Sequence, residues 1–563
     1  MLRKYFDFHK YRYAWLAGIL IFCAILFRLF LMAHNWPPTD SEEGTMGLEA
    51  FHIAFRGEHP IYFYGQNYMG VSEAYLGAVM FRLFGVSVFS LRSGMLLLFT
   101  LFLVLVYLLG SLLYGKKVAC VTLLLLVIGA TNVLIPEMKA VGGAIETLVF
   151  GTAVMLFASW LALSSGGDRE KKGLLWGRRL AYGGWGIATG LGLWSHLLVV
   201  PFVLCSGLLL IICCRRDIFP KNMLFLLVGL LIGAIPLIKY NITAPFAENS
   251  VAVFLQLHNT SYPDAPKGIM LLLKQLTGAF LFTLPIATGV PQVISNIVLP
   301  FYDHYQQKFL LPIVLYGAWS LGYVLLLSCS SWNALKSILL LRRKRASSLS
   351  LEAQERQALI LQTARLLLLG CAWLTLLSYV SSATAAQRPW SYRYLVGLIV
   401  TIPALIAPLM SNHEWLDRIK FIKSRYINAF LLLIILIIPV LGTIQDMSLM
   451  PVGDEIVQQQ KELVTALVRM KINTIYSGYW VCDRVIFQSQ EKVICASLKL
   501  NMTPDLTRYP RYRYIVKQSK RVAYVFTEDG VFHPQDAIAK FAGNHKYSQV
   551  HVNNYIVFVP LQR

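Results

Sequence analysis

The stretch YAWLAGILIFCAILFRLFLMA, residues 13–33, is apolar over the length that one helix needs to cross a lipid bilayer. Basic residues precede it in RKYFDFHKYR, residues 3–12. The apolar run is longer than that of a cleaved signal peptide, and no small-residue cleavage site follows it. The sequence therefore predicts a signal anchor, with a first membrane helix that stays in the protein.

The composition extends this reading to most of the chain. Of its 563 residues, 56% are hydrophobic and only 14% are charged, and the mean hydropathy is +0.57. Soluble domains carry about 25% charged residues. We expect a mostly α, polytopic membrane protein with about eleven transmembrane helices. The expected spans lie near residues 13–33, 92–114, 118–135, 144–164, 180–195, 198–214, 222–240, 309–328, 366–385, 395–411 and 427–445.

The net charge of +22 does not indicate a nucleic-acid partner. Lys and Arg concentrate in alternate loops, for example DREKKGLLWGRR (168–179), LRRKR (341–345) and DRIKFIKSR (417–425). This is the bias that marks cytoplasmic loops. It predicts a multi-pass protein of the cell membrane with a cytoplasmic N-terminus and an extracytoplasmic C-terminal domain.

We expect two domains, a transmembrane module over 1–445 and a small soluble α/β domain over 446–563. In the second, DEIVQQQKELVTALVRMKI (454–472) is typical of an amphipathic helix, and a further helix is expected near 534–543. Short strands are expected in the remaining aromatic and β-branched segments. These are NTIYSGYWV (473–481), DRVIFQ (483–488), EKVICAS (491–497), RVAYVFT (521–527) and HVNNYIVFVP (551–560).

Two further features are left to geometry. Cys482 and Cys495 both fall in the outer domain, where a disulfide between them depends on their separation. The segment KGIMLLLKQLTGAFLFTLPIATGVPQVISN (267–296) is more polar than the spans and is interrupted by Pro285 and Pro291. We interpret it as an interfacial helix or a re-entrant hairpin.

An acidic cluster follows the first span, in PPTDSEEGTMG (37–47), and opens an outer loop over 34–91. One interpretation is purely structural. Thr39 and Glu42 fit a capping box, with Thr39 as N-cap of a surface helix over 44–56. Carboxylates near a helix N-terminus are also stabilising by themselves. The other interpretation is that these carboxylates perform chemistry.

The rest of that loop favours chemistry. AFRGEHPIYFYGQNYMGVSEAYLGAVMFRLFG (54–85) mixes aromatic rings with hydrogen-bonding side chains. Aromatic faces with polar edges suit sugar rings. The candidate substrate-binding residues here are His59, Tyr64, Gln66, Asn67, Tyr68 and Glu73.

In this order, the motifs resemble the GT-C superfamily of integral-membrane glycosyltransferases. The pattern is similar to that of protein mannosyltransferases, aminoarabinose transferases and the bacterial RgtA/B/C/D-like group. The pieces that carry the resemblance, besides the first outer loop, are GGAIETLVFG (142–151), GLGLWSHLLVVPFVL (190–204), GLLIGAIPLIKYNI (229–242) and QRPWSYRYLV (387–396). The resemblance covers roughly residues 10–445.

The resemblance implies transfer of a sugar from a polyprenyl-phosphate donor to a glycan, lipid or protein acceptor at the outer membrane face. In that family an Asp-Glu pair in the first outer loop supplies the general base. This chain departs from the pattern, because DSEE contains no Asp-Glu dipeptide. By register the base is Glu42 or Asp40, and Glu43 is a supporting hydrogen-bond or metal partner.

A lipid-phosphate donor needs positive charge at the outer face, where Arg is suited to phosphate oxygens. The resemblance implies that Arg393 and Tyr394 form the Arg-Tyr step of the late outer loop. Arg388 and Lys139 are further candidates, and the alternative for the arginines is a position at the membrane interface. Further outer-face candidates for substrate binding are Glu137, Glu146 and His196.

No metal or cofactor motif is present in the sequence. A divalent metal ion near the acidic loops, which some relatives use, is left open. Two other functions compete with the transferase. One is a transporter or flippase of a lipid-linked sugar, which would usually show inverted repeats. The other is a non-catalytic cell-envelope assembly protein, for which the DSEE loop would be dispensable.

The charge asymmetry generates a topology prediction. Protease protection in sealed membrane vesicles should place residues 446–563 on the outer side and the basic loops on the cytoplasmic side. Cytoplasmic residues 446–563 would contradict both the topology and the position of the site.

Overall fold

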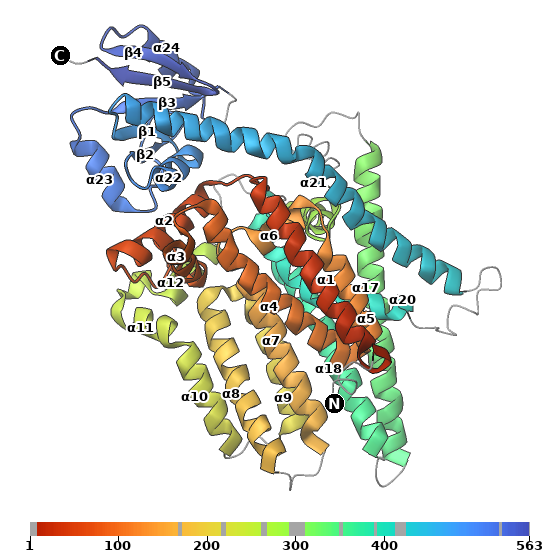
Figure 1. Cartoon of the computed structure of the whole chain (residues 1–563). Helices are drawn as coiled ribbons and strands as arrows, with labels where there is room; N and C mark the ends of the chain where they lie inside the picture. Colours follow the sequence, from red (N-terminus) through yellow and green to blue (C-terminus); the bar gives the residue numbers. More distant parts are fainter. Residues whose placement is uncertain are drawn as a thin grey trace. The chain divides into compact units, whose positions relative to one another are not determined.

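The computed structural model describes residues 8–166, 172–215, 221–259, 267–291, 310–347, 353–387, 391–410, 424–528 and 532–561 (Figure 1). Its elements up to residue 259 are α1 (Phe8–Ala33), α2 (Ser41–Arg56), α3 (Ser72–Phe84), α4 (Val88–Tyr114), α5 (Lys116–Val127), α6 (Thr131–Met138), α7 (Ala144–Leu163), η2 (Ser164–Gly166), α8 (Lys172–Ser195), η3 (Leu197–Val199), α9 (Val200–Cys214), α10 (Lys221–Gly233), α11 (Ile235–Thr243), η4 (Phe246–Glu248) and α12 (Ser250–Asn259). The elements that follow, up to the outer domain, are α13 (Ile269–Thr277), the π-helical turn η5 (Gly278–Thr283), α14 (Leu284–Ala287), α17 (Leu310–Ser347), α18 (Ala353–Val380), α19 (Ala383–Gln387), η6 (Tyr392–Thr401), α20 (Ile402–Met410) and α21 (Ser424–Arg469).

The described residues contain nine helices long and apolar enough to cross a membrane, or eleven if each of two bent helix pairs is one span. The fold is that of a mostly α, multi-pass membrane protein, as the sequence predicts. Two individual spans differ from the prediction. Residues Ile269–Ala287, expected to be interfacial or re-entrant, pass the criteria of length and composition for a span. Helix α8, which contains the expected span 180–195, does not pass them.

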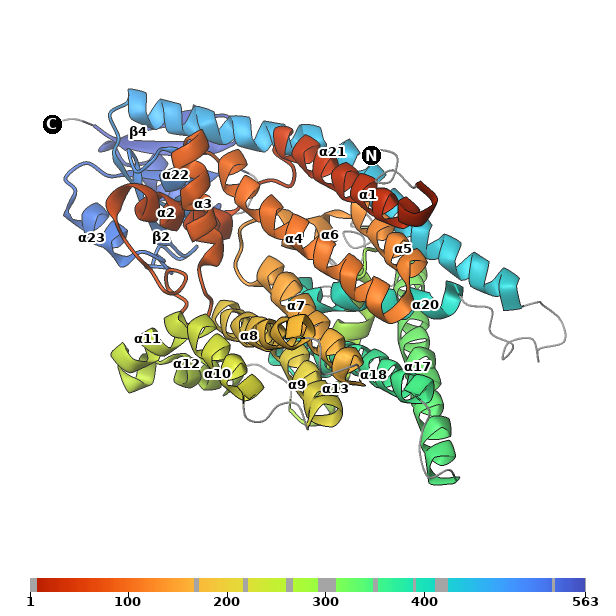
Figure 2. The ribbon, with the colours of Figure 1, turned by 60° about the horizontal axis from the view of Figure 1, so that its bottom comes forward.

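The composition of α8 explains why it falls below the hydropathy of a span. Its sequence KGLLWGRRLAYGGWGIATGLGLWS is rich in glycine, which adds little hydropathy, and contains two arginines. The glycines instead let α8 and α10 approach closely, and the two helices run side by side in both views (Figures 1 and 2). A Cβ on Gly186 would lie 2.3 Å from the Leu226 carbonyl oxygen, and one on Gly229 would lie 2.2 Å from that of Gly183. Small residues at such contacts are typical of helix pairs in membranes.

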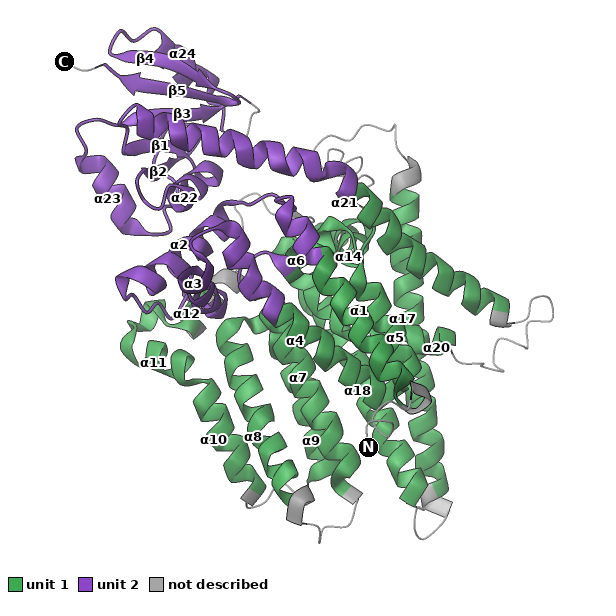
Figure 3. Ribbon diagram, viewed as in Figure 1, with its two compact units in different colours: residues 1–27, 98–137, 143–446 green, residues 28–97, 138–142, 447–563 purple. Residues whose placement is uncertain are grey.

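The chain divides into two compact units (Figure 3). The first contains residues 1–27, 98–137 and 143–446, with most of the membrane helices. The second joins residues 28–97 and 138–142 to residues 447–563. The loop over 34–91 that carries the acidic cluster thus belongs to the same unit as the C-terminal sheet. The expected domains 1–445 and 446–563 stay a prediction, and α21 runs unbroken through that boundary.

The C-terminal part is a five-stranded sheet with the order β2-β1-β3-β5-β4. Strand β1 pairs in parallel with β2 and β3, and β5 pairs antiparallel with β3 and β4. The strands are β1 (Thr474–Gly478), β2 (Ile494–Leu498), β3 (Ala523–Thr527), β4 (Tyr547–Val552) and β5 (Tyr555–Pro560), and the helices are α22 (Tyr479–Gln488), α23 (Pro510–Gln518) and α24 (Gln535–Ala542). The expected α/β architecture and the helix near 534–543 agree with this.

Two of the expected strands are corrected, and one helix is present that the sequence did not predict. DRVIFQ is not a strand, since it forms most of α22, in which Val481, Cys482, Val485 and Ile486 recur at helical spacing and are buried. HVNNYIVFVP is not one strand but parts of two, with a turn between Val552 and Tyr555. Helix α23 was not expected from the sequence.

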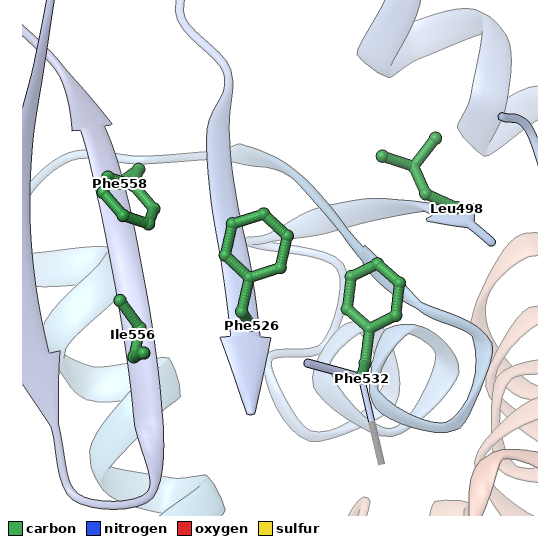
Figure 4. Packing of buried hydrophobic residues seen from close by; sticks show 5 residues of the cluster. All are labelled: Leu498, Phe526, Phe532, Ile556 and Phe558. Atoms are coloured by element: carbon green, nitrogen blue, oxygen red, sulfur yellow. The ribbon is translucent and has the colours of Figure 1, made fainter. Parts of the chain in front are cut away.

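A cluster of aromatic and aliphatic side chains forms the core beside β3 and β5 (Figure 4). Phe526 is fully buried, and its ring centroid lies 5.9 Å from that of Phe558 and 5.6 Å from that of Phe532. Phe541 of α24 packs on the same rings. This packing closes one face of the sheet, so the C-terminal part has a hydrophobic core of its own.

A disulfide joins Cys482 of α22 to Cys495 of β2, whose Cα atoms are 5.1 Å apart. The bridge ties α22 to the edge strand of the sheet. It closes a segment in which the two cysteines are 13 positions apart, and a loop of this length is expected to stabilise a fold by about 3 kcal/mol through the unfolded chain.

We therefore expect the double variant Cys482→Ser/Cys495→Ser to have a free energy of unfolding of its C-terminal part that is about 2–4 kcal/mol lower than in the unsubstituted protein. Denaturant unfolding of the full chain in detergent measures this. Cys329→Ser, which removes an exposed free thiol, is the matched control and should change little. Ready alkylation of Cys482 and Cys495 without a reductant would contradict the bridge.

Candidate functional site

The acidic cluster forms the first turn of α2. Asp40 is the N-cap, and its Oδ1 accepts a hydrogen bond from the Glu43 amide at 2.9 Å. The expected cap, Thr39, is wrong by one residue, because the helix starts at Ser41 and the cap oxygen must reach the third residue of the helix. Glu42 and Glu43 occupy the first turn, where the helix dipole favours negative charge.

Glu43 forms an ion pair with Arg92 at the start of α4. The two bonds are 2.8 Å from Nε to Oε1 and 2.7 Å from a terminal nitrogen to Oε2. Both side chains are buried, with 1% of Arg92 and none of Glu43 exposed. Arg92 also donates to the carbonyl oxygens of Trp36 and Pro37. This bidentate pair fixes the end of the first helix, the acidic turn and the start of α4 to one another.

Asp40 pairs with Lys139, which also donates to the Pro38 carbonyl oxygen at 2.9 Å. Burial raises the pKa of Asp40, but the charge of Lys139, the Glu43 amide and the charge of Arg92 outweigh it, so the net pKa lies below the usual value. The segment that carries Lys139 is itself held, because the Gly142 amide donates to Glu73 at 2.9 Å. Asp40 is therefore an ionised group whose two oxygens are both engaged.

Glu42 faces Arg508, which belongs to the C-terminal part of the chain. The two charged groups are 3.6 Å apart, and 17% of the Glu42 side chain is exposed. Arg508 is almost fully buried, donates from Nε to the Tyr479 hydroxyl at 2.7 Å and lies over the Phe63 ring at 4.6 Å. These contacts orient the Arg508 guanidinium toward the acidic turn.

The N-terminal half of α2 packs directly on α22 (Figure 1). Ser41 donates to the Tyr479 carbonyl oxygen at 2.5 Å, and Thr45 donates to Asp483 at 2.9 Å. Gly44 and Gly47 permit the approach, since a Cβ on Gly44 would lie 2.9 Å from the Arg484 nitrogen and one on Gly47 2.7 Å from the Phe487 ring. The sequence S-E-E-G-T-M-G thus forms the acidic turn and also the face of α2 that packs on α22.

The C-terminal half of α2 carries a polar network. His52 is fully buried, and its two ring nitrogens lie 2.8 Å from the Tyr64 hydroxyl and 3.1 Å from Glu491. The Tyr64 hydroxyl also donates to Glu58 at 2.7 Å, and Tyr512 donates to Glu491 at 2.8 Å. This network joins the aromatic loop to α23 and the end of α22.

The structure also shows where the expected substrate-binding residues of the loop 34–91 lie. Tyr64, Gln66, Asn67 and Tyr68 are half-buried in a turn closed by an antiparallel bridge between Tyr62 and Gly70, and His59 is exposed. Glu73 is fully buried at the start of α3. These residues, the acidic turn and Lys139 all lie in the second unit.

The remaining expected residues lie in the first unit. Arg393 and Tyr394 are half-buried at the start of η6, with the guanidinium carbon 5.5 Å from the Tyr394 ring centroid. His196 lies between α8 and η3, where burial and then the charge of Arg393 lower its pKa to about 4. Glu146 and Glu137 are fully buried, in the first turn of α7 and near the end of α6. Arg388 lies outside the described residues.

A metal ion does not fit the acidic turn as it stands. Within the part of the chain that the structure describes, no group of three or more His, Cys, Asp or Glu side chains could hold a metal. Asp40 and Glu43 each form an ion pair, with Lys139 and Arg92, so their oxygens already have positively charged partners. No step is therefore assigned to a metal.

Comparison with known proteins gives structural neighbours only. No protein-family model matches the chain, and no characterised protein matches its sequence. ArnT from Cupriavidus metallidurans, bound to undecaprenyl phosphate, is similar over 97% of this chain and 98% of its own, with 11% identity and a TM-score of 0.47. The apo oligosaccharyltransferase from Archaeoglobus fulgidus covers 93% of this chain and 70% of its own, with 12% identity and a TM-score of 0.47.

A second structure from Archaeoglobus fulgidus, the oligosaccharyltransferase AglB with an inhibitory peptide and a dolichol-phosphate, has a TM-score of 0.44 and 14% identity, over 99% of this chain and 75% of its own. These neighbours are GT-C membrane glycosyltransferases. That is the superfamily which the sequence motifs resemble. With TM-scores below 0.5, the likeness assigns no activity to this chain.

Sequence reasoning missed the partners of the acidic turn. Arg92 had a weak signal, as a charge near the start of a span, but nothing in the sequence pairs it with Glu43. Arg508, Asp483 and His52 had none, because contacts between distant segments leave no periodic pattern.

Asp483 generates a prediction about pH. Burial raises its pKa to about 6, against the opposing effects of Thr45 and Arg508. A carboxyl group with a raised pKa in the folded state stabilises the fold below its unfolded pKa, near 3.8, and this contribution is lost as pH rises through 6. The unfolding free energy should therefore fall between pH 4 and 7, by about 1.4 kcal/mol for each unit of pKa shift.

Replacing Asp483 by Asn keeps an acceptor for Thr45 and removes the titration. The difference in thermal stability between the Asp483→Asn variant and the unsubstituted protein should grow in favour of Asn from pH 4 to 7. Asp536→Asn, at an exposed position of α24, is the control and should show no such trend. Parallel pH profiles for the Asp483 variant and the unsubstituted protein would exclude the assignment.

Proposed function

We propose that this protein is a membrane glycosyltransferase that moves a sugar from a polyprenyl-phosphate donor to an acceptor hydroxyl at the extracytoplasmic face, with Glu42 as general base. The observation that carries the proposal is the unequal use of the three carboxylates in one helical turn. All three face a cation, and the contact of Glu42 with Arg508, at 3.6 Å, is longer than the two bonds between Glu43 and Arg92. The resemblance of the sequence motifs to GT-C enzymes supplies the class of reaction.

Glu42 suits the role of base better than its neighbours. Both oxygens of Glu43 are bound to Arg92 in a buried pair, which an acceptor cannot reach. Asp40 caps α2 with one oxygen and pairs with Lys139 through the other, and a lowered pKa makes it a weaker base. Glu42 keeps a longer, 3.6 Å contact with Arg508, although Asp40 is the more exposed of the two, at 34% against 17%.

In the proposed step, the acceptor oxygen forms a bond to the anomeric carbon of the sugar while the bond from that carbon to the phosphate oxygen breaks. The acceptor proton passes to Glu42, and the polyprenyl phosphate leaves with the bonding electrons. Proton removal by a placed carboxylate contributes about 10²–10⁴-fold to such a rate. Arg508 acts as a positioning residue, because it holds the Glu42 carboxylate in one direction.

Positive charge is needed where the phosphate leaves. We assign this role to Arg393, supported by Tyr394 and by Arg388 as the sequence suggests. Burial and the charge of Arg393 lower the pKa of His196 to about 4, so His196 itself adds no positive charge at pH 7. Lys139 forms an ion pair with Asp40, and in this proposal its main role is to hold the acidic turn. Glu137 and Glu146 remain candidates for contacts to the substrate.

The half-buried turn of the first outer loop is the proposed contact surface for the sugar or the acceptor. Tyr64 and Tyr68 supply rings, and Gln66 and Asn67 supply amides at the same turn. His59 at its edge and Glu73 at its base complete the set. Which sugar and which acceptor bind is not part of the proposal.

The test is a transfer assay with the isolated full-length protein and a labelled polyprenyl-phosphate sugar, scored by release of the free lipid phosphate. Glu42→Gln should lower turnover by about 10²–10⁴-fold, because the amide cannot accept the proton. Asp40→Asn should lower turnover less, because Asn keeps the helix cap and only the ion pair with Lys139 is lost. Donor binding should survive in both variants.

A separate variant tests the binding of the donor phosphate. Arg393→Ala should weaken donor binding, since the phosphate loses a charged partner, whereas Arg393→Lys should keep part of it. Full turnover in Glu42→Gln would remove the catalytic role and leave a helix cap. Movement of the lipid-linked sugar across the membrane without any release of lipid phosphate would identify a flippase instead.

A further inference from the structure

A hollow of about 390 Å³ lies at the end of β2, between the loop that follows this strand and the start of α23. Hydrogen bonds tie the loop back to the strand, since the Lys499 amide donates to the Thr503 carbonyl oxygen at 2.8 Å and the Asp505 amide donates to that of Ser497 at 2.9 Å. These bonds give the loop a fixed shape. The volume lies within the range of ordinary ligand pockets, and the proposed transfer reaction uses none of the lining.

The lining of the hollow is suited to an anionic group. A terminal nitrogen of Arg513 donates to the Asp505 carbonyl oxygen and, at 3.2 Å, to the Thr507 hydroxyl. Both bonds use the same nitrogen, and a guanidinium carries five N–H donors, which suit the oxygens of a carboxylate or phosphate. Lys499, which is exposed, adds a second positive charge. Of the described lining residues one, Asp505, is acidic, and one of its carboxylate oxygens accepts the Leu506 amide at 2.8 Å. Two cations therefore face one carboxylate.

The surface around the hollow carries further positive charge. Residues 499–521 contain seven Lys and Arg and one acidic residue. Five of the seven are exposed, namely Lys499, Arg511, Arg513, Lys517 and Lys520. Arg513 and Lys517 are four positions apart in α23 and therefore lie on the same face of the helix. Such a cluster of one sign raises the local concentration of a ligand with the opposite charge.

Two carboxylates from other segments contact the tyrosines at this end of the chain. Glu58 accepts a hydrogen bond from Tyr509 at 3.0 Å. Glu491 accepts one from Tyr512 at 2.8 Å and forms an ion pair with Arg56. Because Tyr512 belongs to the buried side of α23, Glu491 lies on a different side of the helix from the exposed cations. The exposed face of α23 thus stays positive.

The packing of α23 favours a soluble polyanion over a bilayer surface as the partner. Tyr512 and Val516 form the buried side of α23, which packs on β2 and β1. A helix that binds a bilayer turns its apolar face to the lipid, and in α23 that face is already used. The exposed face instead combines cations with Tyr514, which is 62% exposed and offers a ring for stacking on a sugar.

We propose that this surface binds an acidic polysaccharide. One carboxylate or phosphate of the chain lies in the hollow on Arg513 and Lys499, and the following units lie along Lys517 and Tyr514. A chain is favoured over a single sugar because the exposed cations extend one turn of α23 beyond the hollow, and only a chain with a charge on each repeat meets them together. The proposal concerns binding alone and does not depend on the transfer reaction.

The experiment uses the full-length protein in nanodiscs of neutral phosphatidylcholine, with a fluorescently labelled oligogalacturonate as the probe. Fluorescence anisotropy should show saturable binding that weakens as the salt concentration is raised, because the contacts are exposed ion pairs. Labelled dextran, a neutral polysaccharide, should bind much more weakly. The double variant Lys499→Gln/Arg513→Gln should weaken binding of the oligogalacturonate by about tenfold or more, since it removes two charge-assisted contacts. Both positions are exposed, so this variant is expected to fold.

The matched control is Lys540→Gln/Lys546→Gln, which removes two exposed positive charges from α24 and from the start of β4, at the other edge of the sheet. It should leave the affinity nearly unchanged, although it alters the net charge equally. Dextran binding as tight as that of the oligogalacturonate, no binding of the oligogalacturonate, or equal affinities of the two double variants would overturn the proposal. If the oligogalacturonate does not bind but the protein co-sediments with phosphatidylglycerol vesicles, and Lys499→Gln/Arg513→Gln abolishes this, the surface is a membrane contact instead.

Discussion

The ion pair between Glu43 and Arg92 is the constraint on which the rest of the site depends. Both partners are buried, and removal of one partner of such a pair typically costs about 3–5 kcal/mol, since the other charge is left without compensation. Arg92 also binds the backbone carbonyls of Trp36 and Pro37. One side chain thus determines where the first helix ends, where α2 begins and which way the acidic turn faces.

With Glu43 held in this way, the other two carboxylates take different positions. Asp40 closes the end of α2 and faces Lys139, and Glu42 points to Arg508. The C-terminal part of the chain therefore contributes directly to the environment of the acidic turn. Ser41, Gly44 and Thr45 make this contact close enough, through α22, for Arg508 to reach Glu42. Three acidic residues within four positions acquire three roles through partners from three parts of the chain.

Local pattern was enough to predict the helical membrane fold, a helix at the position of α2 and most strands of the C-terminal sheet. Apolar runs and period-2 alternation are properties of neighbouring residues, so they are readable in one chain. DRVIFQ was misread because a short apolar segment fits a strand or a helix equally well, and its burial against α2 favours the helix. The roles of Arg92 and Arg508 could not be predicted, since their partners are determined by packing of distant segments.

The most direct test of this account is a double-mutant cycle on the Glu43–Arg92 pair, with unfolding of the full-length protein in detergent as the measured quantity. Glu43→Gln and Arg92→Met should each destabilise the protein strongly, and the double variant should be less destabilised than the sum of the two. The predicted coupling is about 1–3 kcal/mol, as for residues in one buried network. Additive effects, or single variants as stable as the unsubstituted protein, would contradict the claim that this pair holds the acidic turn in place.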